Sequence, residues 1–261
     1  MRCLFCGVGE ALDQDRPNTS LYLTGASGQG LLLDCGFTAA AAFFRHAPDP
    51  AALSAVYLSH FHGDHFLGLP WLLVRLREEG RSAPLAIIGQ PGVEDQVWAA
   101  MDLAYPSFRR LAAFSLDFLE AAPRRTLRAA GFRLTFAAGE HSAPCLAVRA
   151  EDAAGDAHGP GRPAALFYSG DGRPTPATLE LARGVGLAVQ EAYTPEPGHP
   201  THGSAAQALD LARRAGVKAL ALVHLSRAMD EAARAALAAR LAAEPGPRAW
   251  LPREGEAVEI S

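Results

Sequence analysis

The sequence lacks an excess of positive charge and has a single lysine, Lys218. Its 24 Lys and Arg residues stand against 28 Asp and Glu residues, which gives a formal net charge of −4 and a pI near 6.1. This balance excludes a global positive field that would draw the protein to nucleic acid. Local basic patches are compatible with the composition, because nearly all the cations are arginines.

Long apolar runs are absent as well. No run is long enough to span a bilayer, and the apolar stretch after Met1 is too short for the core of a signal peptide. We therefore predict a soluble, cytoplasmic protein with no membrane partner. Hydrophobic residues make up 49% of the 261 positions, which is enough for a large core, and we predict one domain over residues 1–261.

Cysteines are few, and their spacing excludes a zinc ribbon. Cys3 and Cys6 form a CxxC pair, but the second pair that a ribbon needs is missing. Cysteines of a cytoplasmic protein stay reduced. We interpret this pair as buried thiols of a strand, with a structural-metal or redox role as the alternative.

Hydrophobic periodicity and Gly/Pro punctuation predict alternating strands and helices in both halves of the chain. Strands are expected at 1–9, within a hairpin at 20–36, and at 53–60, 83–89, 164–171, 185–192 and 217–226. Helices are expected at 38–47, 67–80, 92–104 and 203–216. A strand-rich stretch from 114 to 149 lies between the halves, and the polar segment 151–163 is predicted to be a mobile loop. Apolar residues at 71–76 and 97–108 could face the protein's own core or a second copy in a homodimer.

The segment SHFHGDH, residues 59–65, places three histidines and an aspartate within six positions. His60 and His62 are two apart, so in an extended stretch they point the same way and can bind one metal. Gly63 lets the chain turn and present Asp64 and His65 as a second pair. A hydrogen-bonded histidine is the ordinary explanation for an isolated residue such as His46 or His158. It does not account for four metal-capable side chains in one short segment.

Three more metal-capable residues each follow an apolar strand elsewhere in the chain: His141, Asp171 and His224. Strand ends of a layered α/β fold lie along one edge, so these residues can meet the cluster in one cleft. Imidazole and carboxylate groups suit borderline divalent metals. We predict two divalent ions, Zn with Mn or Fe as alternatives, about 3.5–4 Å apart and activating a bridging hydroxide.

The motif SHFHGDHFLGLP resembles the H-x-H-x-D-H signature of the metallo-β-lactamase superfamily. The segments LAIIGQPGVEDQV, YSGDGRPTPATLELARGVGLAVQEAY and THGSAAQALDLARRAGVKALALVHLS resemble its ribonuclease Z branch, so the resemblance covers nearly the whole chain. It implies an αββα sandwich, with two mixed sheets flanked by helices and a dinuclear metal site at the sheet edge. It assigns one metal to His60, His62 and His141, the other to Asp64, His65 and His224, and the bridging position to Asp171.

The resemblance also implies a His–Glu pair beside the leaving group. The family motif H-E-A-T corresponds to QEAY here, which retains Glu191, and H-S-T corresponds to HGS, which retains His202. Cleavage of an ester needs a general acid for the leaving oxygen, and a neighbouring carboxylate orients the imidazole and raises its pKa. We therefore predict Asp64, His202 and Glu191 as catalytic residues, with His199 as the competing candidate for the acid.

The sequence departs from the family pattern in ways that bear on the substrate. Gln190, Tyr193 and Gly203 replace the family's His, Thr and Ser, and only 29 residues lie between His141 and Asp171. In ribonuclease Z this interval contains a long arm that grips tRNA. The short interval and the net negative charge favour a phosphodiesterase acting on small phosphodiesters or related esters. The alternatives are a tRNA 3′-processing endonuclease, with RNA as substrate, and a non-hydrolytic cofactor-handling or redox role. Retention of His62 and His65 argues against the redox role, because redox di-iron sites recruit an extra carboxylate.

Overall fold

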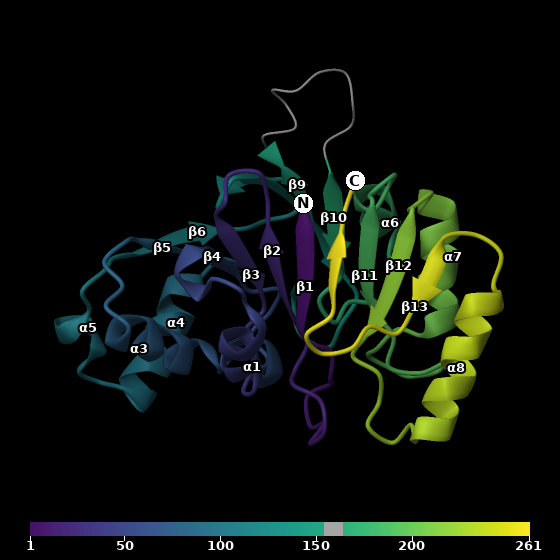
Figure 1. The fold of residues 1–261 in the computed structure, drawn as a ribbon, viewed down its shortest axis with the longest axis horizontal. Helices are drawn as coiled ribbons and strands as arrows, with labels where there is room; N and C mark the ends of the chain where they lie inside the picture. The colour runs from purple at the N-terminus through teal and green to yellow at the C-terminus, as the bar shows by residue number, and fades with distance from the viewer. Residues whose placement is uncertain (154–163) are drawn as a thin grey trace.

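The computed structural model describes residues 1–153 and 164–261, and two seven-stranded sheets form its centre (Figure 1). The first sheet has the order β14-β1-β2-β3-β4-β5-β6, and the second has the order β13-β12-β11-β10-β9-β8-β7. The first contains β1 (Arg2–Gly7), β2 (Ser20–Thr24), β3 (Gly30–Leu33), β4 (Leu53–Tyr57), β5 (Leu85–Gly89), β6 (Leu116–Glu120) and β14 (Ala257–Glu259). The second contains β7 (Thr126–Ala129), β8 (Phe132–Gly139), β9 (Cys145–Asp152), β10 (Ala165–Tyr168), β11 (Leu187–Glu191), β12 (Ala219–Val223) and β13 (Arg248–Trp250).

Both sheets are mixed, and the directions of their strands bring four strand ends to one edge of the molecule. Strands β3 to β6 are parallel, whereas β1 pairs antiparallel with β2 and β14. In the second sheet β10 to β13 are parallel, and β9 runs antiparallel between β8 and β10. As a result β4, β8, β10 and β12 all end at the edge drawn at the bottom of Figure 1.

Helices cover the outer face of each sheet. The first sheet packs against α1 (Ala39–His46), α3 (Leu69–Glu78) and α4 (Val93–Ala104). The second packs against α6 (Pro176–Leu181), α7 (Ala205–Ala215) and α8 (Glu231–Ala243). Three short helices, α2 (Gly63–Phe66), α5 (Phe108–Leu111) and the 3₁₀ helix η1 (Pro50–Ala52), lie in the connections. The predicted αββα sandwich is confirmed.

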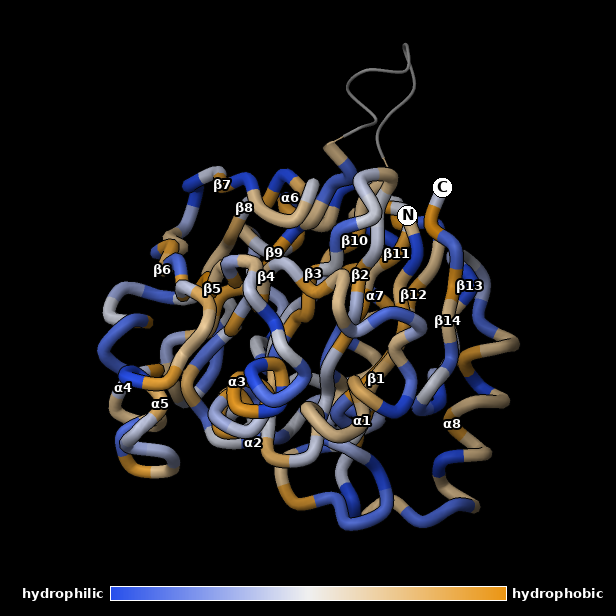
Figure 2. The backbone as a smooth tube through the Cα atoms, turned by 60° about the vertical axis from the view of Figure 1, so that its left-hand side comes forward, coloured by the Kyte–Doolittle hydropathy of each residue, from blue (hydrophilic) through white to orange (hydrophobic). Residues whose placement is uncertain are grey.

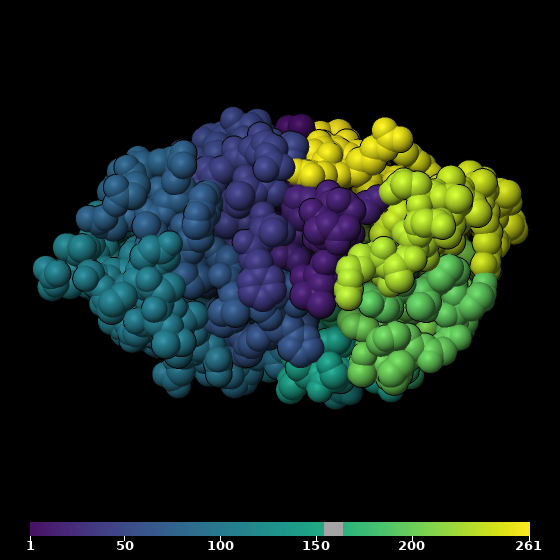
Figure 3. All heavy atoms as spheres, turned by 90° about the horizontal axis from the view of Figure 1, so that it is seen from below, coloured from purple at the N-terminus to yellow at the C-terminus, as the bar shows by residue number. Residues whose placement is uncertain are grey.

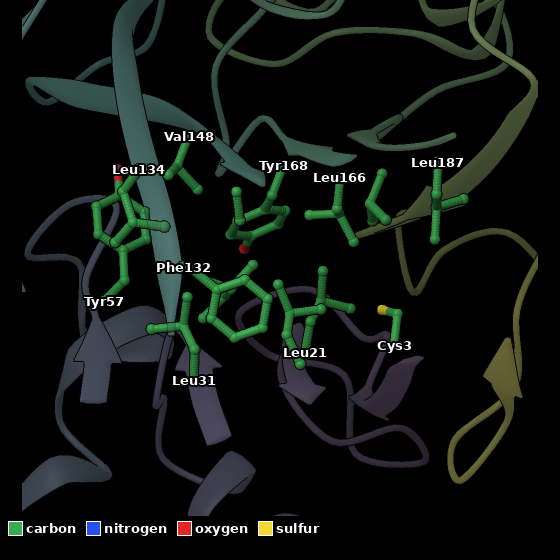
Figure 4. Close-up of a cluster of buried hydrophobic side chains, with 14 of the residues drawn as sticks. Cys3, Leu21, Leu31, Tyr57, Phe132, Leu134, Val148, Leu166, Tyr168 and Leu187 are labelled. Carbon is green, nitrogen blue, oxygen red and sulfur yellow. The ribbon is translucent and has the colours of Figure 1, made fainter. Parts of the chain in front are cut away.

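The main core lies between the two sheets. Figure 4 shows side chains of the first sheet, among them Cys3, Leu21 and Leu31, facing Leu134, Val148, Leu166 and Leu187 of the second. Full burial of such a side chain contributes roughly 1.5–3 kcal/mol, so this layer fixes the sheets, and their strand ends, relative to each other. Figure 2 shows the corresponding pattern along the chain, with apolar colour concentrated in the strands and polar colour in the connections.

The sequence pattern of α7 explains how it covers the second sheet. Ser204 caps its start by accepting a hydrogen bond from the backbone N–H of Gln207 at 3.2 Å, and Gly216 ends it in the left-handed region at φ 64°. One face of the helix is buried and the other is exposed to solvent: Ala208, Leu209 and Ala212 are buried, whereas Asp210, Arg213 and Arg214 are exposed.

Two other expectations from the sequence can be compared with the fold. Cys3 and Cys6 are buried free thiols on β1, as predicted, and they point to opposite faces of the sheet because they are three positions apart. Of the apolar residues at 71–76, Leu72, Leu73 and Leu76 face the core, whereas Trp71 is 40% exposed. Within residues 1–153 and 164–261 no helix combines the length and apolar character needed to cross a bilayer.

The polar segment 151–163 begins differently from the prediction. Glu151 and Asp152 belong to β9 and are buried, and Glu151 pairs with Arg133 and Arg149 at 2.7 and 2.9 Å. These ion pairs explain why Glu151 can continue a strand, and the carboxylate of Asp152 accepts the backbone N–H of Ala26 at 2.9 Å. Residues 154–163, on which the prediction of a mobile loop falls, lie outside the described residues.

Candidate active site

All seven predicted metal ligands lie at the same edge of the molecule. His60 and His62 follow β4, and Asp64 and His65 lie on α2. The other three, His141, Asp171 and His224, follow β8, β10 and β12 of the second sheet. The backbone N–H of His224 donates to the carbonyl of Val8, just after β1, which places this edge at the bottom of Figure 1. Figure 3 views the molecule onto this side, where the N-terminal residues lie between the two halves.

The side chains form two adjacent groups whose ligand atoms lie within 4.8 Å of one another in each group. The first group is His60, His62 and His141, with Nε2 of His141 at 3.1 Å from Nδ1 of His62. The second is Asp64, His65, Asp171 and His224. Asp171 lies between the groups, because its carboxylate is 3.1 Å from His65, 3.2 Å from His224 and 4.0 Å from His60.

The electrostatics of the site keep its carboxylates ionised. Burial by itself would raise the pKa of Asp171, but the charges of His224 and His65 lower this pKa well below its ordinary value. The pKa of Asp64 is lowered in the same way by hydrogen bonds to His224 and His65, against the effect of burial. Burial, together with the charge of His65, lowers the pKa of His60 and favours its neutral form. Ionised carboxylates bind metals directly, whereas His65 and His224, whose pKa values are raised by the charge of Asp171 against the effect of burial, must release their protons when a metal binds.

Several buried atoms of the site make no hydrogen bond within the protein, which fits a cation site. These atoms are Nε2 of His60, Nδ1 of His224, and Nε2 of His65 with Oδ1 of Asp171, which lie 3.1 Å apart as an ion pair without forming a hydrogen bond. An unpaired buried polar atom costs about 1–3 kcal/mol, so a fold that tolerates several in one place favours a bound cation. The donor set, imidazole and carboxylate, fits Zn, Mn or Fe.

Asp34 is a site residue that the sequence prediction missed. It is fully buried at φ 61°, just after β3, and its Oδ2 accepts hydrogen bonds from His65 Nδ1, Tyr168 Oη and Ser59 Oγ, each at 2.7 Å. Ser59 Oγ in turn lies 3.0 Å from Nδ1 of His60. Because each of these imidazoles uses Nδ1 towards Asp34 or Ser59, its Nε2 is left to face the candidate metal position.

The signal that identifies Asp34 was present in the sequence. The segment LLLDCG ends an apolar strand in an acidic residue, as ALFYSGD does before Asp171. The prediction applied this pattern to four other strands; it assigned 31–36 to a strand of a hairpin but did not single out Asp34. In the structure this strand pairs in parallel with β4, so its end lies beside the histidine cluster.

Glycines let the chain after Asp34 pass close to the ligand segment. A Cβ atom on Gly36 would lie 1.7 Å from the carbonyl oxygen of Asp64, and one on Gly68 would lie 1.9 Å from the carbonyl oxygen of Gly36. The backbone N–H of Cys35 also donates to the carbonyl of His65 at 2.8 Å. This close packing fixes the turn of α2 that carries Asp64 and His65.

The predicted acid–base pair lies beside both ligand groups. The ring of His202 is 5.1 Å from that of His141 and 5.2 Å from that of His224, between centroids. Its Nδ1 is 3.7 Å from Oε2 of Glu191, which is fully buried at the end of β11. Oε1 of the same carboxylate accepts a hydrogen bond from the backbone N–H of Gly203, and a Cβ atom at position 203 would lie 3.0 Å from this oxygen. Glycine in place of the family's serine therefore permits a close backbone contact to Glu191.

The competing candidate, His199, has a different environment. Its Nδ1 accepts hydrogen bonds from the backbone N–H groups of His202 at 3.2 Å and Thr201 at 3.4 Å.

Gln190, where the family has histidine, is buried and donates from Nε2 to the carbonyl of Gly172 at 3.0 Å. It thus holds the chain next to Asp171.

An αββα sandwich with two groups of metal-capable side chains at one sheet edge is typical of a class of proteins that bind metal ions there. Comparison with known proteins identifies the family. Residues 30–225 match the model of the Beta-lactamase superfamily domain, so the chain belongs to the metallo-β-lactamase superfamily. The chain is 27% identical to Ribonuclease Z of Methanosarcina acetivorans over 277 positions, which cover 87% of this chain and 88% of that protein.

Solved structures show the same fold. The human tRNase Z short form superposes with a TM-score of 0.78 at 19% identity, covering all of both chains. A diphosphatase from the PhnP family superposes with a TM-score of 0.71 at 16% identity, covering 100% of this chain and 98% of that one. The predicted membership of the metallo-β-lactamase superfamily and the likeness to ribonuclease Z are confirmed, and with them the prediction of a hydrolytic enzyme acting on ester bonds.

Proposed function

We propose that the protein is a metal-dependent phosphodiesterase whose substrate is RNA, cleaved as in 3′-processing by ribonuclease Z. One observation carries the proposal. Glu191 and His202 lie against a cluster of seven metal-capable side chains, in a chain that aligns over most of its length with a protein named Ribonuclease Z. A general acid beside a cation site is the arrangement that cleavage of a phosphodiester requires.

The residues that would hold the metals follow from the two ligand groups. His60, His62 and His141 would bind one divalent ion, Asp64, His65 and His224 the other, and Asp171 would contact both. When bound, two divalent ions supply Lewis-acid activation of water and neutralise charge on the phosphate. We propose Zn, with Mn or Fe as alternatives that the same ligands accommodate.

The remaining steps belong to the protein's own groups. His202 donates a proton to the leaving oxygen from the face of the site next to His141 and His224. Glu191, whose carboxylate lies 3.7 Å from Nδ1 of His202 and accepts the backbone N–H of Gly203, orients this imidazole. Asp34 and Ser59 hold the rings of His65 and His60.

The sequence favoured small substrates over RNA, and the comparisons reverse this order. Relatives that are 27% and 28% identical to this chain carry the names Ribonuclease Z and Ribonuclease BN, whereas a small substrate has weaker support. One observation keeps small phosphodiesters as a second candidate. The alignment with Ribonuclease Z spans 277 positions, more than the 261 residues of this chain, so the relative has insertions that this chain lacks.

The experiment compares substrates directly. Metal-supplemented protein is incubated with a precursor tRNA carrying a 3′ trailer, with the same tRNA lacking the trailer, with bis-p-nitrophenyl phosphate and with a cyclic nucleotide. We expect endonucleolytic removal of the trailer at a kcat/KM above that for the small diesters, abolished by chelator and by Asp171→Ala. Turnover of the small diesters without cleavage of precursor tRNA would establish the second candidate. Absence of any diester cleavage would contradict both.

A further inference from the structure

Three aromatic rings meet at the candidate general acid. The ring of Tyr193 stacks on that of His202 at 4.9 Å between centroids, with an angle of 22° between their planes. His199 contacts both, at 4.8 Å from Tyr193 and 5.1 Å from His202. His202 also stacks on His224 at 5.2 Å and 27°. The orientation of the acid is therefore restricted by a candidate metal ligand, His224, and by two neighbours outside the ligand set, Tyr193 and His199.

His199 holds the backbone that carries the acid. Its Nδ1 accepts the backbone N–H groups of Thr201 and His202, and its carbonyl oxygen accepts a hydrogen bond from Nη1 of Arg173 at 3.4 Å. A ring nitrogen that accepts N–H bonds carries no proton, so the proton of neutral His199 lies on Nε2. The carbonyl of Thr201, in the same turn, is 3.1 Å from Nδ1 of His141. The turn 199–202 thus links the acid to a candidate metal ligand.

Tyr193 connects the same turn to the carboxylate. Its backbone N–H donates to Oε2 of Glu191 at 3.3 Å, the oxygen that lies 3.7 Å from Nδ1 of His202. Its side chain is partly buried and covers the ring of His202. A threonine, which the related motif has at this position, offers the backbone N–H but no ring to stack. The ring contact is therefore specific to chains with an aromatic residue here.

We propose that Tyr193 and His199 are positioning residues for His202: Tyr193 stacks on its imidazole, and His199 accepts hydrogen bonds from the turn that carries it. Neither touches the reacting atoms. This inference rests on the proposed function in one respect, the role of His202 as general acid. It predicts that loss of either contact harms only those reactions that need a proton on the leaving group.

The test uses two diesters that differ in their leaving group. A dinucleotide such as UpU leaves an alkoxide that needs a proton, whereas bis-p-nitrophenyl phosphate leaves a stable phenolate. Removal of a general acid costs ~10²–10⁴-fold, and misplacement should cost less, on the order of 10-fold in kcat for UpU in Tyr193→Thr and His199→Ala. The kcat for bis-p-nitrophenyl phosphate should change less than about twofold in both variants, since this substrate does not depend on the acid.

Conservative variants separate positioning from folding. Tyr193→Phe keeps the ring and should recover most of the UpU activity lost in Tyr193→Thr. His199→Asn keeps an acceptor that can reach the same N–H groups and should recover part of the activity lost in His199→Ala. His46→Ala, whose imidazole pairs with Glu254 away from the site, is the matched control for loss of a histidine. Equal losses on both substrates, or no recovery in the conservative variants, would overturn the proposal.

A second measurement is independent of activity. Long-range ¹H–¹⁵N spectra of the metal-free, ¹⁵N-histidine-labelled protein, assigned with His199→Asn, report which ring nitrogen carries the proton. We expect His199 as the Nε2–H tautomer, with Nδ1 unprotonated. A proton on Nδ1 of neutral His199 would refute its role as acceptor. If the wild type cleaves neither diester, the proposed function fails, and this spectrum still decides whether His199 holds the turn.

Discussion

The carboxylate of Asp34 lies 2.7 Å from Nδ1 of His65, and both side chains are fully buried. Through Ser59 the same carboxylate also reaches His60, in the other ligand group. A single acidic residue outside the ligand set thus orients one imidazole for each candidate metal. Removing it should disturb both positions at once.

Asp34→Ala should therefore reduce metal content and stability together. Loss of a group that orients a metal ligand typically costs 10–100-fold in metal affinity. The variant also leaves buried donors on Ser59, His65 and Tyr168 without an acceptor, at about 1–3 kcal/mol for each. Elemental analysis and chemical denaturation would measure the two effects. Asp49→Ala, which removes only a local cap of η1, is the control, and a variant that matches it in metal content would contradict this role.

The pH dependence of the Asp34 contribution has a definite sign in the metal-free protein. Burial by itself would lower the pKa of His65, but the carboxylates of Asp171 and Asp34 raise it well above the ordinary value. A raised histidine pKa stabilises the fold fully below the unfolded pKa, about 6.5, and this stabilisation is lost as pH rises through the folded pKa. The difference in unfolding free energy between wild type and Asp34→Asn, measured by urea denaturation in chelator, should therefore shrink as pH rises from about 6.5 towards the folded-state pKa of His65. A difference that grows with pH would show that the pair is not ionised as described.

Replacement of Asp171 should remove more metal than replacement of a histidine outside the site. Its carboxylate contacts members of both ligand groups, so Asp171→Ala should lower the content from two metal equivalents per chain to one or fewer. His46→Ala should retain both. Equal metal contents in the two variants would mean that the bridging position is misassigned.

The role of His202 can be tested by the leaving group. His202→Ala should depress cleavage of an alkyl diester by ~10²–10⁴-fold and that of an activated aryl diester much less. Glu191→Gln should show the same pattern more weakly, because Glu191 acts through the imidazole. The ratio of kcat/KM for the two diesters in the wild type and both variants is the measurement. A variant that loses metal instead would make His202 a ligand and move the acid to another residue.

The segment between β9 and β10 should be dispensable for small substrates. The strand ends that flank it, at Asp152 and Ala165, lie at the top of Figure 1, opposite to the ligand edge. Deleting several residues within 154–163 should leave hydrolysis of bis-p-nitrophenyl phosphate within a few-fold of the wild type. A loss of a hundredfold or more would indicate instead that the segment closes over the substrate.

The sequence predicted the candidate metal ligands better than the residues that hold the site's side chains in place. Metal-capable residues at strand ends are visible as short polar interruptions of apolar runs, which is why the positions of His141, Asp171 and His224 could be inferred. Asp34 escaped because its importance depends on which strand lies beside β4, a tertiary pairing that periodicity does not encode. The contacts of Tyr193 and His199 depend likewise on the path of a turn. The start of the polar segment was misplaced because Glu151 forms ion pairs with Arg133 and Arg149 within the sheet. These pairs neutralise the charge that made the residue look like part of a polar loop.

The candidate metal ligands come from both sheets. Metal binding by the full set therefore depends on how much of the chain has been synthesised. His60, His62, Asp64 and His65 come from the first sheet, and the remaining ligands from the second, with Asp64 and His224 separated by 160 positions. A nascent chain that has emerged only as far as β6 contains three histidines and one aspartate of the candidate ligands but not Asp171. On the proposed ligand assignment, hydrolytic activity would begin only when the second sheet has docked, so an incomplete translation product would carry none.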